Sequence, residues 1–264
     1  MRSRAIAGVL LAAALGALGS PRVAGAPRER HEVGRAVIEW EVGTLEATEV
    51  SAFAQLVDRG VADIEALVAP GLPQWAQRTR RIRVVVSSRA QISRAYGRTV
   101  LLPVARVRSR TAPYLHEITH VLVPSRGDRT WLSEGFASYL EAWVSENRGG
   151  YDAHVFSRAG DRGIHAAARR WLSREQGRAV LPWVGSRGEP PGMDWNRSRV
   201  ARPFYVLSHS FTKYLVDHAG LTPMVGLLVD GEDDAAFLRL TEKSETEWKS
   251  EWLAAIGVPE IARS

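Results

Sequence analysis

The chain has 264 residues, of which 45% are apolar and 24% are charged, and it contains no cysteine. This composition excludes an intrinsically disordered chain and a disulfide scaffold, because enough apolar surface is present to form a core without covalent cross-links. The formal net charge of +6 does not indicate nucleic-acid binding, since only three of the 35 basic residues are lysines, and so uniform an arginine bias is more typical of coding composition than of a phosphate-binding surface.

Residues 1–26 have the features of a secretory signal peptide. Two arginines precede an apolar run over residues 5–18. A stretch of small residues that ends at Ala26 is typical of the site where a signal peptidase removes the leader. This run of 14 residues is too short to cross a bilayer as a helix. We therefore expect an exported bacterial protein, periplasmic or extracellular, without stable membrane insertion once the leader is removed. The alternatives are cleavage after Gly19 or Gly25, an uncleaved leader that tethers an interaction domain, and a buried N-terminal helix.

The first part of the mature chain predicts three strands and one long helix. Strand-forming residues occur over residues 36–42, 82–86 and 99–104. Apolar residues recur at helical spacing over residues 46–68, and the prolines at positions 70 and 73 end that helix. A turn at Tyr96-Gly97 is expected to join the second and third strands, which predicts that these two strands are neighbours in one sheet.

The later part of the chain is predominantly helical. Residues 111–123 predict a helix with Pro113 in its first turn, and residues 131–146 predict a second helix with Ser133 as a candidate N-cap. Further helices are expected over residues 164–173, 203–218, 222–229, 234–241 and 245–256. The intervening segment, residues 176–202, is irregular and long enough to cover a functional site. Because the strands come early in the chain and the helices come late, we predict an α+β fold in one domain over residues 27–264. It would have a small N-terminal sheet followed by a helical C-terminal half.

The sequence His116-Glu117-Ile118-Thr119-His120 is typical of a zinc site. Two histidines at positions i and i+4 lie one turn apart on one helix face, which is the spacing that two imidazoles need to reach a single ion. Glu117 projects about a third of a turn away, where it can accept a proton from water instead of binding the metal. A tetrahedral catalytic site also needs a third protein ligand and an open position, and the candidate ligand is Glu134.

Together the two motifs resemble the gluzincin metallopeptidases, and most closely the peptidase MA-like group. The second motif is the segment WLSEGFASYLE at residues 131–141, and the resemblance extends to residues 205–220 and to the closing Trp252-Leu253 pair. It covers residues 80–256. The resemblance implies a zincin-like metalloprotease fold, a Zn2+ cofactor held by His116, His120 and Glu134, Glu117 as the general base, and a peptide or protein as the substrate.

Two features depart from better-known gluzincins. Thirteen residues separate His120 from Glu134, a shorter connection than in thermolysin or the large aminopeptidases, although it still allows two antiparallel helices joined by a tight loop. Ser138 stands one turn after Glu134, where thermolysin has a carboxylate that orients a zinc histidine. Support for the histidines is therefore expected from elsewhere, with Glu141 as a candidate.

The resemblance also implies that a tyrosine or histidine from a later helix stabilises the oxyanion. Tyr205 is the candidate catalytic residue, with His209 one turn further along as the reserve. The alternative interpretation of Tyr205 is a core aromatic residue whose hydroxyl finds a backbone partner. For the whole chain, the alternative is an exported zinc-binding or interaction module of zincin fold with little or no peptidase activity.

Acidic residues are absent between Glu65 and Glu117, although this stretch contains ten arginines. Aminopeptidases of the gluzincin type bind the substrate amine through a glutamate upstream of the metal helix, so the resemblance disfavours an aminopeptidase. It also implies that the strand over residues 99–104 forms the rim of the cleft and pairs with extended substrate. Four arginines near this strand would favour acidic side chains or a terminal carboxylate if they faced the cleft: Arg98, Arg106, Arg108 and Arg110. The alternative is a solvated strand face.

Overall fold

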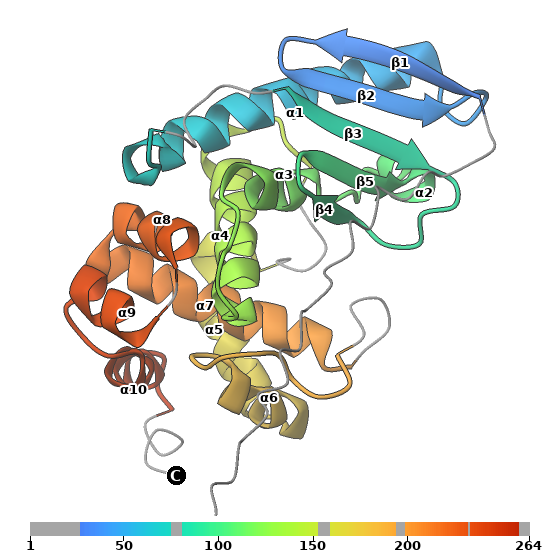
Figure 1. Ribbon diagram of the computed structural model, residues 1–264. Helices are drawn as coiled ribbons and strands as arrows, with labels where there is room; N and C mark the ends of the chain where they lie inside the picture. Colours follow the sequence, from blue (N-terminus) through green and yellow to red (C-terminus); the bar gives the residue numbers. More distant parts are fainter. Residues whose placement is uncertain (1–26, 75–80, 153–158, 194–198, 232, 259–264) are drawn as a thin grey trace, which may run out of the picture.

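The chain forms a five-stranded sheet followed by a body of helices (Figure 1). The computed structural model describes residues 27–74, 81–152, 159–193, 199–231 and 233–258. This arrangement confirms the predicted α+β class, with the sheet at the N-terminal end and most of the helices in the C-terminal half. The expected leader over residues 1–26 lies outside the described residues. Across the described ranges, none of the helices is long and apolar enough to span a bilayer.

The sheet is mixed and has the strand order β1-β2-β3-β5-β4. Its strands are β1 (Arg28–Val33), β2 (Ala36–Glu41), β3 (Ile82–Ser87), β4 (Arg94–Tyr96) and β5 (Thr99–Pro103). The three central strands β2, β3 and β5 run parallel, whereas β1 and β4 pair antiparallel at the two edges. The central β3 has the sequence IRVVVS and is almost entirely buried, as expected for a strand that is covered on both faces.

Two predictions about the sheet need correction. β3 and β5 are neighbours, as predicted, and run parallel, but the turn at Tyr96-Gly97 joins β4 to β5 and not β3 to β5. Gly97 has φ +54°, which suits the tight connection of that hairpin. β5 is paired on both sides, so the strand over residues 99–104 is not the free rim, and β4 is the edge strand at this end of the sheet. The short, arginine-containing β4 has too few residues to show a strand pattern in the sequence.

Helix α1 (Ala47–Val68) packs against β1, β2 and the helix that carries the two histidines (Figure 1). Its buried positions recur at helical spacing, from Val50 to Val68. Glu46 is the N-cap, and its backbone N–H donates to Glu49 Oε2 over 2.9 Å in a capping box. The predicted helix over residues 46–68 is thus confirmed to within one residue.

Most of the remaining helices form the body below the sheet, whereas α2 (Val104–Arg108) packs beside β3 and β5 (Figure 1). The others are α3 (Tyr114–Leu122), α4 (Thr130–Arg148), α5 (Gly160–Leu172), α6 (Glu175–Val180), α7 (Ala201–Ala219), α8 (Leu221–Asp230), α9 (Asp234–Thr241) and α10 (Glu245–Ala255), with 3-10 turns at Ala69–Gly71 and Leu181–Trp183. α4 packs along α7 at the centre of this body. A stack of three aromatic rings forms part of its core, because Phe211 lies 4.8 Å from Trp131 and 5.1 Å from Trp252 between ring centroids.

Both helices that carry the metal motif begin elsewhere than predicted. α3 starts at Tyr114 with Pro113 as its N-cap, because the preceding residues still complete the end of α2, where the Thr111 N–H donates to the Arg106 carbonyl. α4 starts at Thr130 with Arg129 as its N-cap, so Ser133 lies inside the helix and was wrongly predicted as a cap.

Three other regions can be compared with the predicted elements. Where it is described, the segment over residues 176–202 is less irregular than predicted, since it opens within α6 and continues into a 3-10 turn. The helix predicted over residues 234–241 is confirmed at both ends. The capping box predicted at Ser244 and Glu247 is also present.

Candidate metal centre

Two helices bring the three predicted metal ligands to one point. His116 and His120 lie one turn apart on α3, and Glu134 lies near the start of α4. The two Nε2 atoms of the histidines are 3.1 Å apart, and Glu134 Oε2 lies 3.0 Å from that of His116 and 3.6 Å from that of His120. In the part of the chain that the structure describes, these residues are the one set of three or more possible ligands whose donor atoms lie within 4.8 Å of one another.

The distances among these three atoms suit a tetrahedral ion. Bonds of about 2.1 Å at tetrahedral angles separate two ligand atoms by about 3.4 Å. The observed separations of 3.0, 3.1 and 3.6 Å bracket that value. Two imidazole nitrogens and one carboxylate oxygen are also a donor set that zinc prefers, and three protein ligands leave a fourth position for water or substrate.

Opposite charges are concentrated at this point. Burial by itself lowers the pKa of His116, but its hydrogen bond to the Glu134 carboxylate raises that pKa to about 9. Burial would raise the pKa of Glu134, yet the neighbouring His120 and His116 hold it far below its usual range. The carboxylate therefore stays ionised, and the cluster favours a positive charge at its centre.

Glu117 is buried on the same turn of α3, with 6% of its surface exposed. Burial raises the pKa of its carboxyl group, against the lowering effect of His116 and His120. A raised pKa makes a carboxylate a stronger proton acceptor, which is the property that a general base needs.

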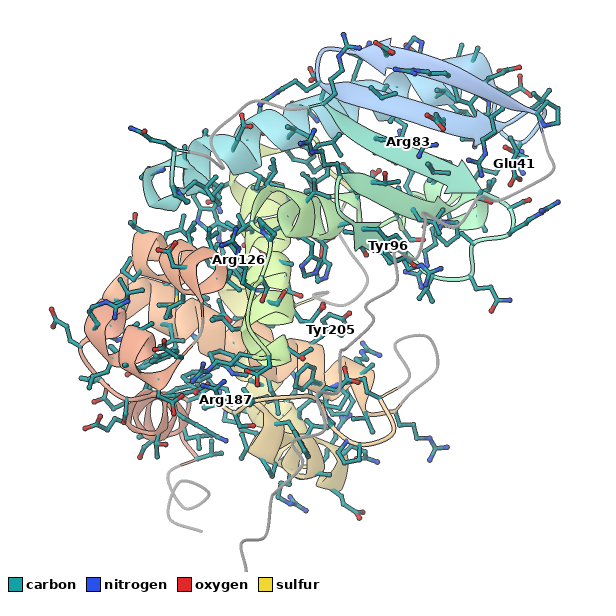
Figure 2. All side chains as sticks on the ribbon, in the orientation of Figure 1. Glu41, Arg83, Tyr96, Arg126, Arg187 and Tyr205 are labelled. Carbon is teal, nitrogen blue, oxygen red and sulfur yellow. The ribbon has the colours of Figure 1, made fainter. Side chains whose placement is uncertain are left out.

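Tyr205 approaches the histidines from α7. Its ring centroid lies 5.8 Å from that of His116, and the two planes meet at 65°. Figure 2 shows Tyr205 on α7 and Tyr96 above it at the edge of the sheet. Burial raises the pKa of the Tyr205 phenol well above its ordinary value, and the charges of Glu134 and Glu117 add to this effect. The phenol therefore keeps its proton and can donate a hydrogen bond.

The reserve candidate, His209, has a different environment. Its side chain is almost fully buried, and its Nε2 lies 3.5 Å from Asp161 Oδ1 on α5. Lys213 Nζ lies 3.1 Å from the other carboxylate oxygen of Asp161. Burial lowers the pKa of His209, although Asp161 opposes this effect. His209 thus links α7 to α5, whereas the ring contact with His116 is made by Tyr205.

A glycine next to Glu134 allows α4 and α7 to approach closely. A Cβ atom built on Gly135 would lie 2.4 Å from Thr212 Oγ1 and 2.6 Å from the Ser208 carbonyl oxygen. The second distance is to backbone, which cannot move without shifting α7. Gly135 therefore sets the separation between Glu134 on one helix and Tyr205 on the other.

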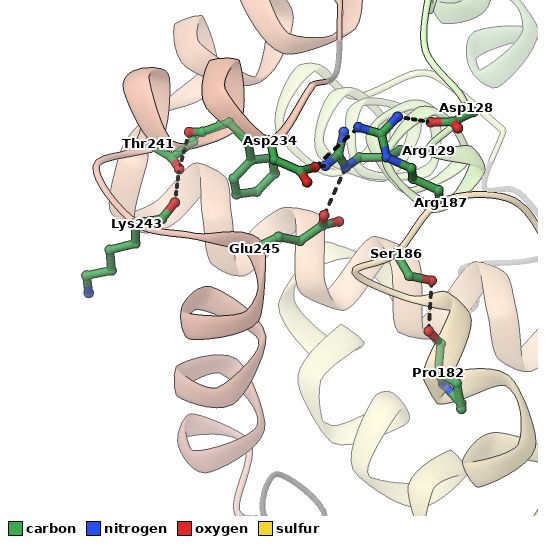
Figure 3. A network of polar contacts seen from close by, with 10 residues as sticks. Asp128, Arg129, Pro182, Ser186, Arg187, Asp234, Thr241, Lys243 and Glu245 are labelled. Atoms are coloured by element: carbon green, nitrogen blue, oxygen red, sulfur yellow. Dashed lines mark hydrogen bonds and ion pairs between the residues drawn. The ribbon is translucent and has the colours of Figure 1, made fainter.

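Charged residues fix the connection between α3 and α4 (Figure 3). The buried Arg129 side chain donates through Nε to Glu245 Oε2 over 2.9 Å and also pairs with Asp234. Arg187 bridges Asp128, at 3.1 Å, and Asp234, at 3.3 Å. The short connection is thereby held against α9, α10 and the segment after α6, so the start of α4 has a fixed position relative to α3.

Sequence reasoning missed two serines that contact the histidines. Ser138 Oγ lies 3.4 Å from His116 Nδ1, and Ser133 Oγ lies 3.4 Å from His120 Nδ1. The spacing of Ser138 one turn after Glu134 could have indicated the first contact, because both residues share one face of α4. Glu141, the candidate named for this support, is buried on α4, and its charge helps to raise the pKa of His116.

Comparison with known proteins shows similarity to solved structures. No family model and no curated protein matches the sequence. A two-domain M1 zinc metallopeptidase mutant with bound L-arginine is 17% identical, over 90% of this chain and 50% of its own, with a TM-score of 0.44. An M1 zinc metallopeptidase from Deinococcus radiodurans is 16% identical, over 90% of this chain and 50% of its own, with a TM-score of 0.39. The chain spans about half the length of these structures, and similarity at this level decides neither its fold nor its activity.

Proposed function

We propose that the chain is a zinc-dependent metallopeptidase that hydrolyses peptide bonds. The convergence of His116, His120 and Glu134 at ligand spacing is the observation that supports this function best. The buried Glu117 beside them supplies the base that a catalytic site requires and a structural zinc site does not. We place this activity in a zincin-like domain over residues 27–264, exported behind a leader over residues 1–26.

Each proposed residue has a separate role. His116, His120 and Glu134 hold Zn2+, which when bound polarises the substrate carbonyl and makes water more acidic. Glu117 accepts a proton from the attacking water and returns it to the leaving amine. The neutral Tyr205 phenol donates a hydrogen bond to the carbonyl oxygen as negative charge develops on that atom.

The proposed activity can be tested with an undirected peptide mixture. The purified mature protein, loaded with one equivalent of zinc, should cleave peptides at discrete bonds, as followed by mass spectrometry. The Glu117→Gln protein, prepared in the same way, should leave the mixture intact and serves as the control for contaminating proteases. A wild-type protein that binds zinc yet cleaves nothing would favour the alternative, a zinc-binding or interaction module without turnover.

Tyr205→Phe should lower kcat by about two orders of magnitude, because it removes only the donor to the developing oxyanion. Zinc content and KM should change little, since the ring and its packing remain. Tyr214→Phe is the matched control, because Tyr214 lies on the same helix with its ring 4.1 Å from that of His218. Steady-state kinetics on one cleaved peptide measures both variants. An unchanged kcat in Tyr205→Phe would make Tyr205 a core residue.

A preference for acidic substrates is a second proposal about the same site. Two exposed arginines lie at the edge strand β4, which packs against the histidine helix α3. Arg94 is the first residue of the strand, and Arg98 lies two residues after the strand's end at Tyr96. The Arg94 guanidinium also lies 4.6 Å from the centre of the Tyr96 ring, so its charge is held at this edge. The stretch that contains β4, residues 66–116, has no acidic residue. Acidic side chains near the scissile bond, or a terminal carboxylate, should therefore bind better than basic groups.

A peptide library decides this preference. In the double variant Arg94→Gln/Arg98→Gln, kcat/KM for acidic peptides should fall about fivefold, with little change for neutral peptides. Arg170→Gln is the control, because Arg170 is an exposed arginine on α5. Peptides with acetylated N-termini should be cleaved as well as free ones. A requirement for a free N-terminal amine, or a preference for basic residues, would refute the proposal.

A further inference from the structure

The two histidines of the candidate zinc site have the same pattern of contacts. The Nε2 atoms of His116 and His120 meet 3.1 Å apart at the shared centre, while each Nδ1 atom lies 3.4 Å from a serine hydroxyl of α4. We propose that Ser138 and Ser133 are positioning residues that hold the two imidazoles with Nε2 toward the metal. This inference rests on the proposed zinc site but not on the peptidase activity.

The arrangement of α4 explains why one helix can support both rings. Ser138 lies one helical turn after Glu134, and Ser133 lies directly before it. The turn of α4 that supplies the carboxylate therefore also places one hydroxyl behind each imidazole. Ser138 is 2% exposed, so water does not compete freely for its contact with His116.

Hydrogen bonding at Nδ1 determines which ring nitrogen can bind a metal. A neutral imidazole carries one proton, and a metal at Nε2 requires that proton to be on Nδ1. In that tautomer the Nδ1–H group of each histidine donates to the serine oxygen. A serine within a helix can at the same time donate its own proton to a carbonyl of the preceding turn, so the hydroxyl remains available as an acceptor.

A neutral hydroxyl performs this function at lower electrostatic cost than a carboxylate would. Glu117, Glu134 and Glu141 already act electrostatically on His116. A further buried carboxylate would add repulsion and another desolvation penalty. Serine orients the ring without adding charge, which gives a physical reason for Ser138 at a position where a carboxylate was expected.

Zinc affinity tests the proposal directly. Ser138→Ala and Ser133→Ala should each weaken zinc binding by about tenfold, and the double variant by more, because loss of such contacts typically costs ten- to a hundredfold in metal affinity. Ser145→Ala is the matched control, since Ser145 lies on the same helix and its buried Oγ has no hydrogen-bond partner among the described residues. Ser133→Thr keeps a hydroxyl at this partly exposed position. Its zinc affinity should therefore stay close to that of the wild type and above that of Ser133→Ala. Competition with a chelating dye gives the dissociation constants.

Two further measurements separate positioning from general destabilisation. Thermal unfolding of the zinc-free proteins should show similar melting temperatures for Ser133→Ala and Ser145→Ala. In the zinc-loaded proteins, the Nδ1 protons seen by NMR should exchange faster with water in the serine variants, because the acceptor is gone.

Several outcomes would overturn the proposal. Wild-type zinc affinity in both alanine variants would do so. Loss of affinity only in Glu141→Gln would assign the support to that carboxylate instead. A failure of the peptidase assay in zinc-loaded wild-type protein would contradict the proposed function while leaving the affinity series interpretable.

Discussion

Replacing His116, His120 or Glu134 by alanine should abolish stoichiometric zinc binding, whereas Glu117→Gln should keep zinc and lose turnover. The ligand atoms of the first three residues lie within 4.8 Å of one another, so each removal leaves two ligands for one ion. Two ligands do not fix a tetrahedral geometry, and the affinity should fall below the level that survives dialysis. Metal content measured on the purified proteins checks this prediction.

Glu117→Gln tests a different property of the same helix. The amide has nearly the same size as the carboxylate but cannot accept the proton, so kcat should fall by about 10² to 10⁴ with unchanged zinc content. For the two histidine-to-alanine variants of the metal ligands, the control is His218→Ala, which should keep zinc. His218 lies at the far end of α7 with its Nδ1 2.7 Å from the Tyr214 carbonyl. If Glu117→Gln lost as much zinc as the three ligand variants, the assignment of Glu117 as a base and not a ligand would be contradicted.

Gly135→Ala should destabilise the protein and weaken the metal site, although it adds only a methyl group. The new Cβ would lie 2.6 Å from the Ser208 carbonyl oxygen and 2.4 Å from Thr212 Oγ1, so α4 and α7 would have to separate. Overpacking of this kind costs about 1–3 kcal/mol of the free energy of unfolding. The shift would also displace Glu134 from the histidines and from Tyr205, so zinc affinity and kcat should fall together.

A second glycine provides the matched control for this change. Gly163 lies in α5, and a Cβ there would meet only the Ala159 Cβ, at an ordinary 3.5 Å. Because alanine favours a helix over glycine by about 1 kcal/mol, Gly163→Ala should leave the melting temperature unchanged or raise it. Chemical denaturation and zinc titration of both variants measure the two effects. Similar stability in both would contradict the assigned role of the close approach at Gly135.

The sequence by itself was sufficient for the features that depend on local periodicity. The i and i+4 spacing of His116 and His120 fixes their relative position on any α-helix, so the metal pair and the base between them could be predicted without a structure. The long helix α1, the capping box at Ser244 and the division into early strands and late helices followed from the same local patterns. Each depends on residues that are near one another in the chain.

Strand pairing and element ends depended on contacts that the sequence does not display. β3 and β5 are neighbours because β4 occupies the edge, and they run parallel because β4 runs antiparallel between them in the chain. β4 has only three residues. α4 begins before Ser133 because Arg129, at its N-cap, is held by Asp234 and Glu245, which are more than 100 residues away. Such pairings bring distant segments together, and no local periodicity specifies them.

Only the tertiary structure decided how the parts of the site meet. Glu134 reaches the two histidines because the connection between α3 and α4 is held by ion pairs and because Gly135 lets α4 lie close to α7. The contacts of Ser133 and Ser138 with the imidazoles depend on the same packing. The physical reason is that spacing within one helix is set by backbone geometry, whereas the distance between two helices is set by the side chains packed between them.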